Sequence, residues 1–398
     1  MSHFHCRLIF ALALASMPFL SGCEHPSTSV AADKPVPVPF DPVPQSRNPN
    51  DVGRFIAGMP GTEGSPFAKL EATDAWKQHR NSLDAAWHKA ESPLMSGLTE
   101  FQKAELNDES LRNAPVFYPF GGPDALTVTL CFPHSPTYVM VALEPPGTLP
   151  TLAQFERKDA PKYLAEIRET VASELGKSFF VTREMDKQFR GQVTDGLLLP
   201  ILHLLVRTNN TILGMRYVRL DDEGQVVDRT ADYQSPNRNG NKGFELQFRS
   251  NSDQSVHQLY YFSVNLADDR LKDNKPFLSY VAGLKGSTTM LKATSYMTHQ
   301  KEFSLIREQV LSTSSALLQD DSGIPYKYFE PDVWKVQLYG DYIRPYGSFR
   351  WLEQPDLRKA YAAGAKPLSL HLGYGYLRIT SNLLLARRMS PAPALAKR

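Results

Sequence analysis

Residues 65–112 carry apolar side chains at a spacing close to that of a helix with one buried face. The residues that set this spacing are Leu70, Ala75, Trp76, Leu83, Trp87 and Ala90. Pro66 stands near the start, and Pro93 is expected to follow the end of the first helix. A second helix is predicted from Leu98 to Leu111.

After residue 125 the pattern changes to alternation of apolar and polar side chains, which is typical of a strand. Leu126, Val128 and Leu130 alternate with Thr127, Thr129 and Cys131. A second short apolar run covers residues 138–143, and the turn-forming segment at 134–136 separates the two. The pattern therefore predicts a β-hairpin.

Beyond this hairpin, strands and helices continue to alternate in clusters. Strands are predicted at 178–183, 212–219, 244–249 and 257–264, and helices at 159–176, 287–298 and 301–318. This order predicts an α+β fold with mainly antiparallel sheets and packed helices. The pattern I-R-E-x-V occurs at residues 167–171 and 306–310, each in a predicted helix that follows a β-rich stretch. A duplicated β-then-helix unit explains this repeat, and so does chance.

The composition is that of an ordinary globular protein, with 42% hydrophobic and 22% charged residues. A net charge of +2 argues against a dedicated nucleic-acid-binding protein. The chain is long enough for an N-terminal α+β part at 51–230 and a C-terminal α+β part at 231–398, or for one domain that includes both. The polar segment 228–243 is the expected surface loop or seam.

The N-terminal segment has the three parts of a secretory signal: a basic start with Arg7, an apolar run from Leu8 to Leu20, and small residues after it. The apolar run is too short to cross a bilayer as a helix. Its end, Leu20-Ser21-Gly22-Cys23, resembles the lipobox of bacterial lipoproteins. The resemblance implies that residues 1–22 are removed and that Cys23 is lipidated. Because Glu24 is not the aspartate that retains such proteins in the inner membrane, it also implies the outer membrane.

Residues 23–50 then form a predicted tether, because a proline-rich segment with few large apolar residues cannot bury enough surface to fold. Its prolines are Pro26, Pro35, Pro37, Pro39, Pro42, Pro44 and Pro49. Of the three cysteines, Cys6 leaves with the signal and Cys23 takes the lipid, which leaves Cys131 alone. We expect Cys131 to be a buried, inert thiol.

Asp124 is the first candidate for acid–base chemistry. It ends the segment FYPFGGPD at 117–124, where two glycines and two prolines make a tightly turned backbone that can hold a carboxylate in a fixed orientation. The simpler interpretation is that Asp124 binds backbone N–H groups in the turn or caps the next element.

Asp320 and Asp321 are the second candidate, in the segment LQDDSGIP at 318–325. We expect them at a helix C-terminus, where adjacent carboxylates are unfavourable and suggest a role in binding a ligand or cation. A plain turn has the same composition. With Asp124, either residue would complete the carboxylate pair of a glycoside hydrolase.

The third candidate is the aromatic-rich stretch 326–351. It holds nine aromatic residues, where the chain average of 11% predicts about three. The residues selected as a possible binding face are Tyr328, Trp334, Tyr339, Tyr342 and Trp351. Two interpretations are open: the rings are buried in a β core, or they form an exposed face that binds carbohydrate or protein.

Several common motifs are missing from the sequence. It contains no paired histidine spacing for zinc, no nucleophile elbow, no Walker loop and no dinucleotide-binding fingerprint. No metal and no cofactor are therefore predicted.

The segments FYPFGGPD and LQDDSGIPYKYF resemble those of an uncharacterised family of secreted bacterial proteins. The similarity extends to residues 366–369 and 373–375. The family has no established activity, so it implies no catalytic residue. We therefore expect an envelope lipoprotein that binds or scaffolds, held to the membrane by its lipid, with envelope polysaccharide or another envelope protein as partner. An envelope glycan hydrolase is the alternative.

Overall fold

The computed structural model describes residues 48–157, 196–229, 241–378 and 380–389, together with isolated positions between 161 and 178. These residues belong to one compact unit that covers residues 40–398. The signal segment with Cys23, most of the tether, and nearly all of the strand predicted at 178–183 lie outside the described residues. So does part of the first I-R-E-x-V repeat.

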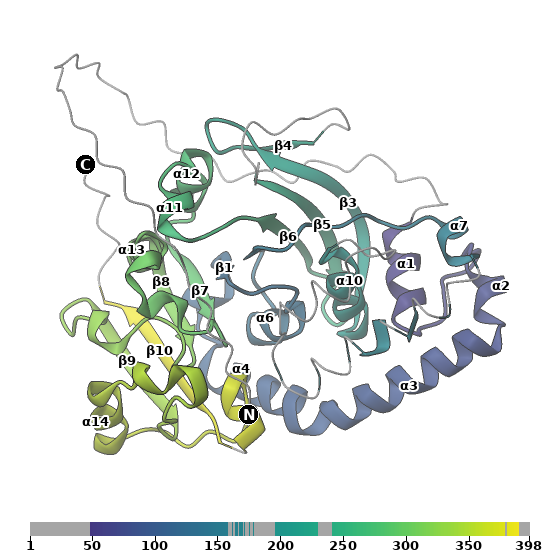
Figure 1. Cartoon of the computed structure of the whole chain (residues 1–398). Coiled ribbons are helices and arrows are strands. Elements are labelled where there is room, and N and C mark those ends of the chain that lie inside the picture. The colour runs from purple at the N-terminus through teal and green to yellow at the C-terminus, as the bar shows by residue number, and fades with distance from the viewer. Residues whose placement is uncertain are drawn as a thin grey trace, which may run out of the picture. The chain divides into compact units, whose positions relative to one another are not determined.

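Ten strands of the described chain form one sheet in the order β4-β3-β5-β6-β2-β1-β7-β8-β10-β9 (Figure 1). Their bounds are β1 Val116–Pro119, β2 Thr137–Ala142, β3 Asn210–Leu220, β4 Val226–Asp228, β5 Lys242–Ser250, β6 Val256–Ser263, β7 Ser287–Leu291, β8 Ser314–Gln319, β9 Trp334–Gly340 and β10 Asn382–Arg388. The five central strands, from β6 to β8, run parallel, and the flanking strands pair antiparallel. The α+β class is confirmed, with a sheet that is mixed and has a parallel centre.

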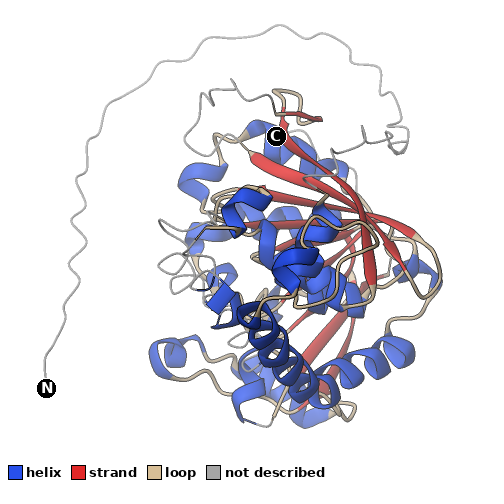
Figure 2. Ribbon diagram, turned by 90° about the vertical axis from the view of Figure 1, so that its right-hand side faces the viewer, coloured by secondary structure: helices blue, strands red, loops and turns tan. Residues whose placement is uncertain are grey.

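Helices cover both faces of this sheet (Figure 2). They are α1 Pro49–Ile56, α2 Ala68–Glu71, α3 Asp74–Ala90, α4 Gly97–Glu105, α5 Glu109–Arg112, α6 Ala125–Cys131, α7 Leu152–Phe155, α10 Leu198–Arg207, α11 Asp268–Leu271, α12 Lys275–Gly283, α13 Ser304–Thr313 and α14 Pro355–Ala363. One core packs α1, α3, α4, α6 and α10 on one face, and a second core packs α12, α13 and α14 on the other. Among the described helices, none is long and apolar enough to cross a membrane.

The strands predicted at 212–219, 244–249 and 257–264 are confirmed as β3, β5 and β6. The predicted hairpin is wrong, because residues 125–131 form helix α6 and connect β1 to a parallel β2. Six of the seven residues of α6 are buried. The threonines produced the alternation that predicted a strand, but their hydroxyls form hydrogen bonds inside the protein. The hydroxyl of Thr129, for example, donates to the carbonyl oxygen of Ala125.

Two further helix predictions need correction. Residues 287–291, placed in a helix, form the fully buried strand β7, and the segment predicted as one helix at 301–318 divides into α13 and β8. Short buried strands lack a polar face, so their periodicity does not separate them from buried helices. The first long helix, α3, ends at Ala90, before residue 93 as predicted, and a π-helical turn at Glu91–Ser96 connects it to α4.

Two histidines lie in the core between α3 and α10. His79 and His203 are buried, and the Nε2 atom of His79 lies 2.8 Å from the carbonyl oxygen of Ile56. Burial lowers the pKa of His79 to about 4 and that of His203 to about 3, and nearby arginine charge adds to the effect at both. Both imidazoles are therefore neutral in the folded protein at neutral pH.

We expect this burial to make the fold sensitive to acid. The unfolded chain takes up protons near pH 6.5 while the folded chain does not, so stability falls as the pH drops below 6.5 toward 4. For His203 the loss at pH 5 is about 2 kcal/mol, from about 1.4 kcal/mol per pH unit. Chemical denaturation at pH 7 and pH 5 should show a smaller loss in His203→Leu than in the wild type. His88→Leu, a change at an exposed histidine, should keep the wild-type loss; equal losses in all three proteins would contradict this account.

Candidate functional site

The topology creates a crevice at the carboxyl ends of β1 and β7. The chain leaves β1 through α6 toward β2, and it leaves β7 through α13 in the opposite direction, toward β8. Helix α6 packs in one core and α13 in the other, so the two connections lie on opposite faces of the sheet (Figure 1). In sheets with parallel strands, ligands bind outside the carboxyl ends of the strands at such a switch point.

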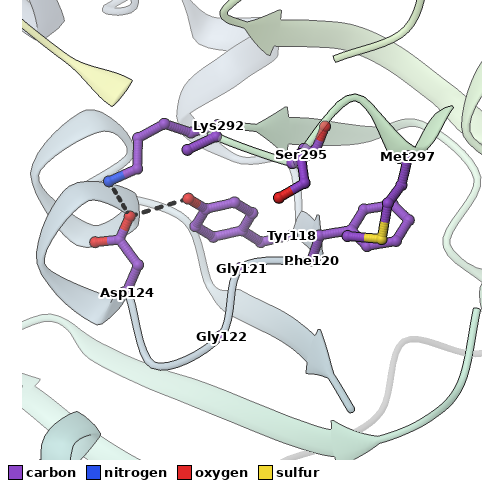
Figure 3. A pocket seen from close by; sticks show the side chains of 10 residues that line it. Tyr118, Phe120, Gly121, Gly122, Asp124, Lys292, Ser295 and Met297 are labelled. Atoms are coloured by element: carbon purple, nitrogen blue, oxygen red, sulfur yellow. Dashed lines mark hydrogen bonds and ion pairs between the residues drawn. The ribbon is translucent and has the colours of Figure 1, made fainter. Parts of the chain in front are cut away.

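A cavity of about 70 Å³ lies at this switch point (Figure 3). It is lined by Tyr118, Phe120, Gly121, Gly122 and Asp124 from the segment after β1, and by Lys292, Ala293, Thr294, Ser295 and Met297 from the segment after β7. Of the sequence candidates, Asp124 is the one that lines it. Segments more than 150 residues apart in the chain thus build one site.

Asp124 is positioned by the turn that follows β1. Phe120 and Gly122 adopt left-handed backbone angles, with φ of 64° and 56°. Gly121 packs directly on the ring of Tyr118, where a Cβ would lie 2.6 Å from Cγ of that ring. The side chain of Asp124 then caps α6 by accepting a hydrogen bond of 3.0 Å from the N–H of Thr127. The capping role that the sequence left open is confirmed, although the capped element is a helix.

Lys292 forms a buried ion pair with Asp124. The side chains of Lys292 and Asp124 are only 3% and 2% exposed. Tyr118 donates to the same carboxylate oxygen at 2.9 Å, and Lys292 also donates to the hydroxyl of Thr127 at 2.9 Å. Sequence reasoning missed Lys292 because it placed residues 287–298 in a helix, which hid the position of this lysine at the end of a central strand.

The loop after Lys292 is held in an unusual backbone conformation. Ala293, Ser295 and Tyr296 have φ of 51°, 55° and 55°, a region that residues with a side chain rarely adopt. Side chains from other segments bind its N–H groups: Asp320 accepts from Ala293 at 2.9 Å, and the hydroxyl of Tyr374 accepts from Ser295 at 3.0 Å. Such strain persists where the surroundings enforce it, and it gathers at functional sites.

Asp320 and Asp321 follow strand β8 and are buried. The expected helix C-terminus is therefore wrong, and so is the dipole argument drawn from it. Asp320 supports the strained loop, and Asp321 accepts hydrogen bonds from the hydroxyl of Tyr296 and from the side-chain amide of Asn382. Burial raises the pKa of both carboxyl groups, and burial together with the charge of Asp320 raises that of Asp321 to about 7.

Asp124 does not form a carboxylate pair with Asp320 or Asp321 across an open cleft. Asp124 borders the cavity but is engaged by Lys292, Tyr118 and the N-terminus of α6. Asp320 and Asp321 are not among the residues that line the cavity. All three serve as internal hydrogen-bond acceptors that fix the segments around the site.

The aromatic candidates divide between the interior and the surface. Trp334 and Tyr339 are buried; the guanidinium of Arg388 lies over the Trp334 ring, and the hydroxyl of Tyr339 donates to Glu105 at 2.7 Å. Tyr328 and Tyr342 are half-buried. Trp351, in the 3-10 segment η6 Gly347–Leu352, is 69% exposed. These five residues therefore do not form one continuous face.

The segment that carries Trp351 nevertheless contacts the loop beside the cavity. The Phe349 ring lies 5.1 Å from the Tyr296 ring and 6.1 Å from the Tyr374 ring. Tyr374 also contacts Ser295, since their hydroxyl oxygens are 3.1 Å apart. Tyr296, Phe349 and Tyr374, which we call the aromatic cluster, connect the exposed surface of η6 to a residue that lines the cavity.

Cys131 is buried, as expected, and burial raises the pKa of its thiol to about 12, so it is not a nucleophile. Within the described parts of the chain, no group of three or more His, Cys, Asp and Glu residues is arranged to hold a metal ion. No family model, no curated protein and no solved structure matches the chain.

The buried ion pair predicts a specific pattern of stability. Lys292→Met leaves the Asp124 carboxylate buried without its counter-charge, and we expect it to lower the free energy of unfolding by about 3–5 kcal/mol. Lys292→Met combined with Asp124→Asn removes both charges while the asparagine can still cap α6, so most of the loss should be recovered. Urea denaturation of the wild type, Lys292→Met, Asp124→Asn and the double variant gives the coupling energy. If the double variant loses as much free energy of unfolding as the two single variants lose together, the two groups do not interact.

Proposed function

We propose that this protein is a lipid-anchored protein of the bacterial envelope that binds an envelope component, without catalysis, at the cavity between β1 and β7. The observation that carries the binding function is the cavity at the topological switch point, where a buried ion pair and a strained loop meet. A protein that maintains an ion pair and several left-handed residues in one place bears a cost in stability there. A ligand-binding site gives a reason for that cost.

The absence of an open carboxylate pair within the site favours binding over hydrolysis. A glycoside hydrolase needs one carboxyl group on each side of the scissile bond. Among the residues that line the cavity, Asp124 supplies the only carboxylate, and its oxygens are occupied by Lys292, Tyr118 and Thr127. Asp321, whose raised pKa would suit a general acid, is buried away from the lining.

The anchor is proposed from the sequence Leu20-Ser21-Gly22-Cys23 after an apolar run. In a Gram-negative host fed an alkyne analogue of palmitate, the wild-type protein should carry the label and sediment with the outer membrane. Cys23→Ser should lose the label and leave the membrane fraction. Cys131→Ala, which removes a buried thiol, should keep both properties. Labelling that persists in Cys23→Ser would refute the anchor.

The binding function is tested with cell-wall sacculi and a panel of envelope polysaccharides. We expect the full-length lipoprotein, in a detergent without a sugar headgroup, to be retained without release of reducing ends. Met297→Trp, which places a larger side chain at the cavity, should reduce retention at least tenfold. Met389→Trp, at an exposed position beyond β10, should not.

The outcomes of this experiment separate the candidate functions. Release of reducing ends that disappears in Asp124→Asn or Asp321→Asn would make the protein a hydrolase and overturn the proposal. Retention that is equal in wild type and Met297→Trp would place binding elsewhere on the protein. No retention on any glycan would exclude these envelope components as ligands.

A further inference from the structure

We propose that the cavity receives the acetamido group of an N-acetylated amino sugar in an envelope glycan. This inference rests on the proposed function and names the chemical class of its ligand. It follows from the size of the cavity, the charges that line it, the position of its apolar wall and the exposed aromatic residues on the segment that contacts the cavity loop.

The size of the cavity restricts what can enter. Pockets that enclose a whole drug-sized ligand have volumes of about 300–1,000 Å³. The cavity here measures about 70 Å³, several-fold less than such a pocket. It therefore accepts one small substituent of a larger ligand, while the rest of that ligand stays outside.

The charges of the lining select a neutral substituent. The charged side chains among the ten lining residues are Lys292 and Asp124, which neutralise each other as an ion pair. A carboxylate or phosphate would be placed beside Asp124, and an ammonium group beside Lys292, and either like-charge contact would oppose binding. A neutral group that both accepts and donates hydrogen bonds meets neither repulsion.

Hydrogen-bonding groups suited to an amide are present. The ammonium group of Lys292 has three donors, and within the described residues two of them are directed at Asp124 and Thr127. The third can donate to the carbonyl oxygen of an acetamido group. The hydroxyl of Ser295, held by the hydroxyl of Tyr374, can accept from the amide N–H.

The apolar wall accounts for the methyl group. Phe120 and Met297 both line the cavity on the side away from the ion pair (Figure 3). The Phe120 ring is fixed by an edge-to-face contact with Phe303 at 5.9 Å, and the thioether of methionine adapts to small apolar groups. A hydroxymethyl group could form hydrogen bonds at the polar end of the cavity, but it has no methyl group to pack against Phe120 and Met297.

Exposed aromatic residues on the segment that contacts the cavity loop favour a sugar as the carrier of the acetamido group. Trp351 and Tyr346 are 69% and 44% exposed on and next to η6, which the aromatic cluster holds against the loop that contains Ser295. Large flat rings of this kind present apolar faces that pack against the C–H face of a pyranose. An acetylated lysine in a protein has an acetamido group but no such ring.

Calorimetric titration of the full-length lipoprotein, in a detergent without a sugar headgroup, tests this assignment with four ligands. They are the methyl glycosides of N-acetylglucosamine, glucosamine and glucose, and Nε-acetyl-lysine. We expect methyl N-acetylglucosaminide to bind at least tenfold more tightly than each of the other three. Met297→Trp should abolish this preference, and Ser295→Ala should weaken it several-fold, while Met389→Trp should retain it. Thermal unfolding verifies that each variant is folded.

Trp351→Ala tests recognition of the sugar ring independently of recognition of its acetamido group. It should weaken binding of the N-acetylglucosaminide severalfold and leave that of Nε-acetyl-lysine unchanged. Equal binding of the glucoside would show that the acetamido group is not recognised, and equal binding of Nε-acetyl-lysine would overturn the assignment to a sugar. Retention on sacculi that depends on Met297, without binding of the N-acetylglucosaminide, would overturn this inference and leave the proposed function in place.

Discussion

The ion pair between Lys292 and Asp124 is the interaction on which the organisation of the site depends. Removing two charges from water costs several kcal/mol for each ion, and this cost is recovered only when the charges are close and their remaining bonds are made. Here the carboxylate also binds Tyr118 and caps α6, and the ammonium group also binds Thr127. The pair therefore connects the ends of β1 and β7 with the start of α6, and a change in any of these groups affects the others.

The sheet topology explains why these groups meet. Parallel strands need a helical connection between them, and right-handed connections that leave two neighbouring strands in opposite directions lie on opposite faces. The segments after β1 and β7 then diverge, and the space between them is not closed by either helix. The turn of FYPFGGPD enters this space from one side, and the strained loop from 293 to 296 enters from the other. Asp320, Ser322 and Tyr374 hold that loop from outside through its backbone N–H groups.

The sequence was sufficient for elements that have one polar and one apolar face. The helical region at 65–112 and the strands β3, β5 and β6 follow from their periodicity, although the helix predicted at 98–111 divides into α4 and α5. It was insufficient in the centre, where α6, β7 and β8 are buried on nearly all sides and periodicity no longer separates helix from strand. For the same reason Lys292 was missed, whereas Asp124 was found because its turn has distinctive glycines and prolines. The aromatic stretch was recognised as a group, but only the structure separates the buried Trp334 and Tyr339 from the exposed Trp351.

The most direct test of the central claim is an NMR measurement of the lysine side-chain ammonium groups at neutral pH. Exposed ammonium protons exchange with water too fast to be seen, whereas a buried, paired ammonium group is protected. We predict a protected signal that disappears in Lys292→Met, shifts in Asp124→Asn and shifts again when methyl N-acetylglucosaminide is added. The absence of a protected signal that depends on Lys292 would contradict the buried ion pair and, with it, the account of the site.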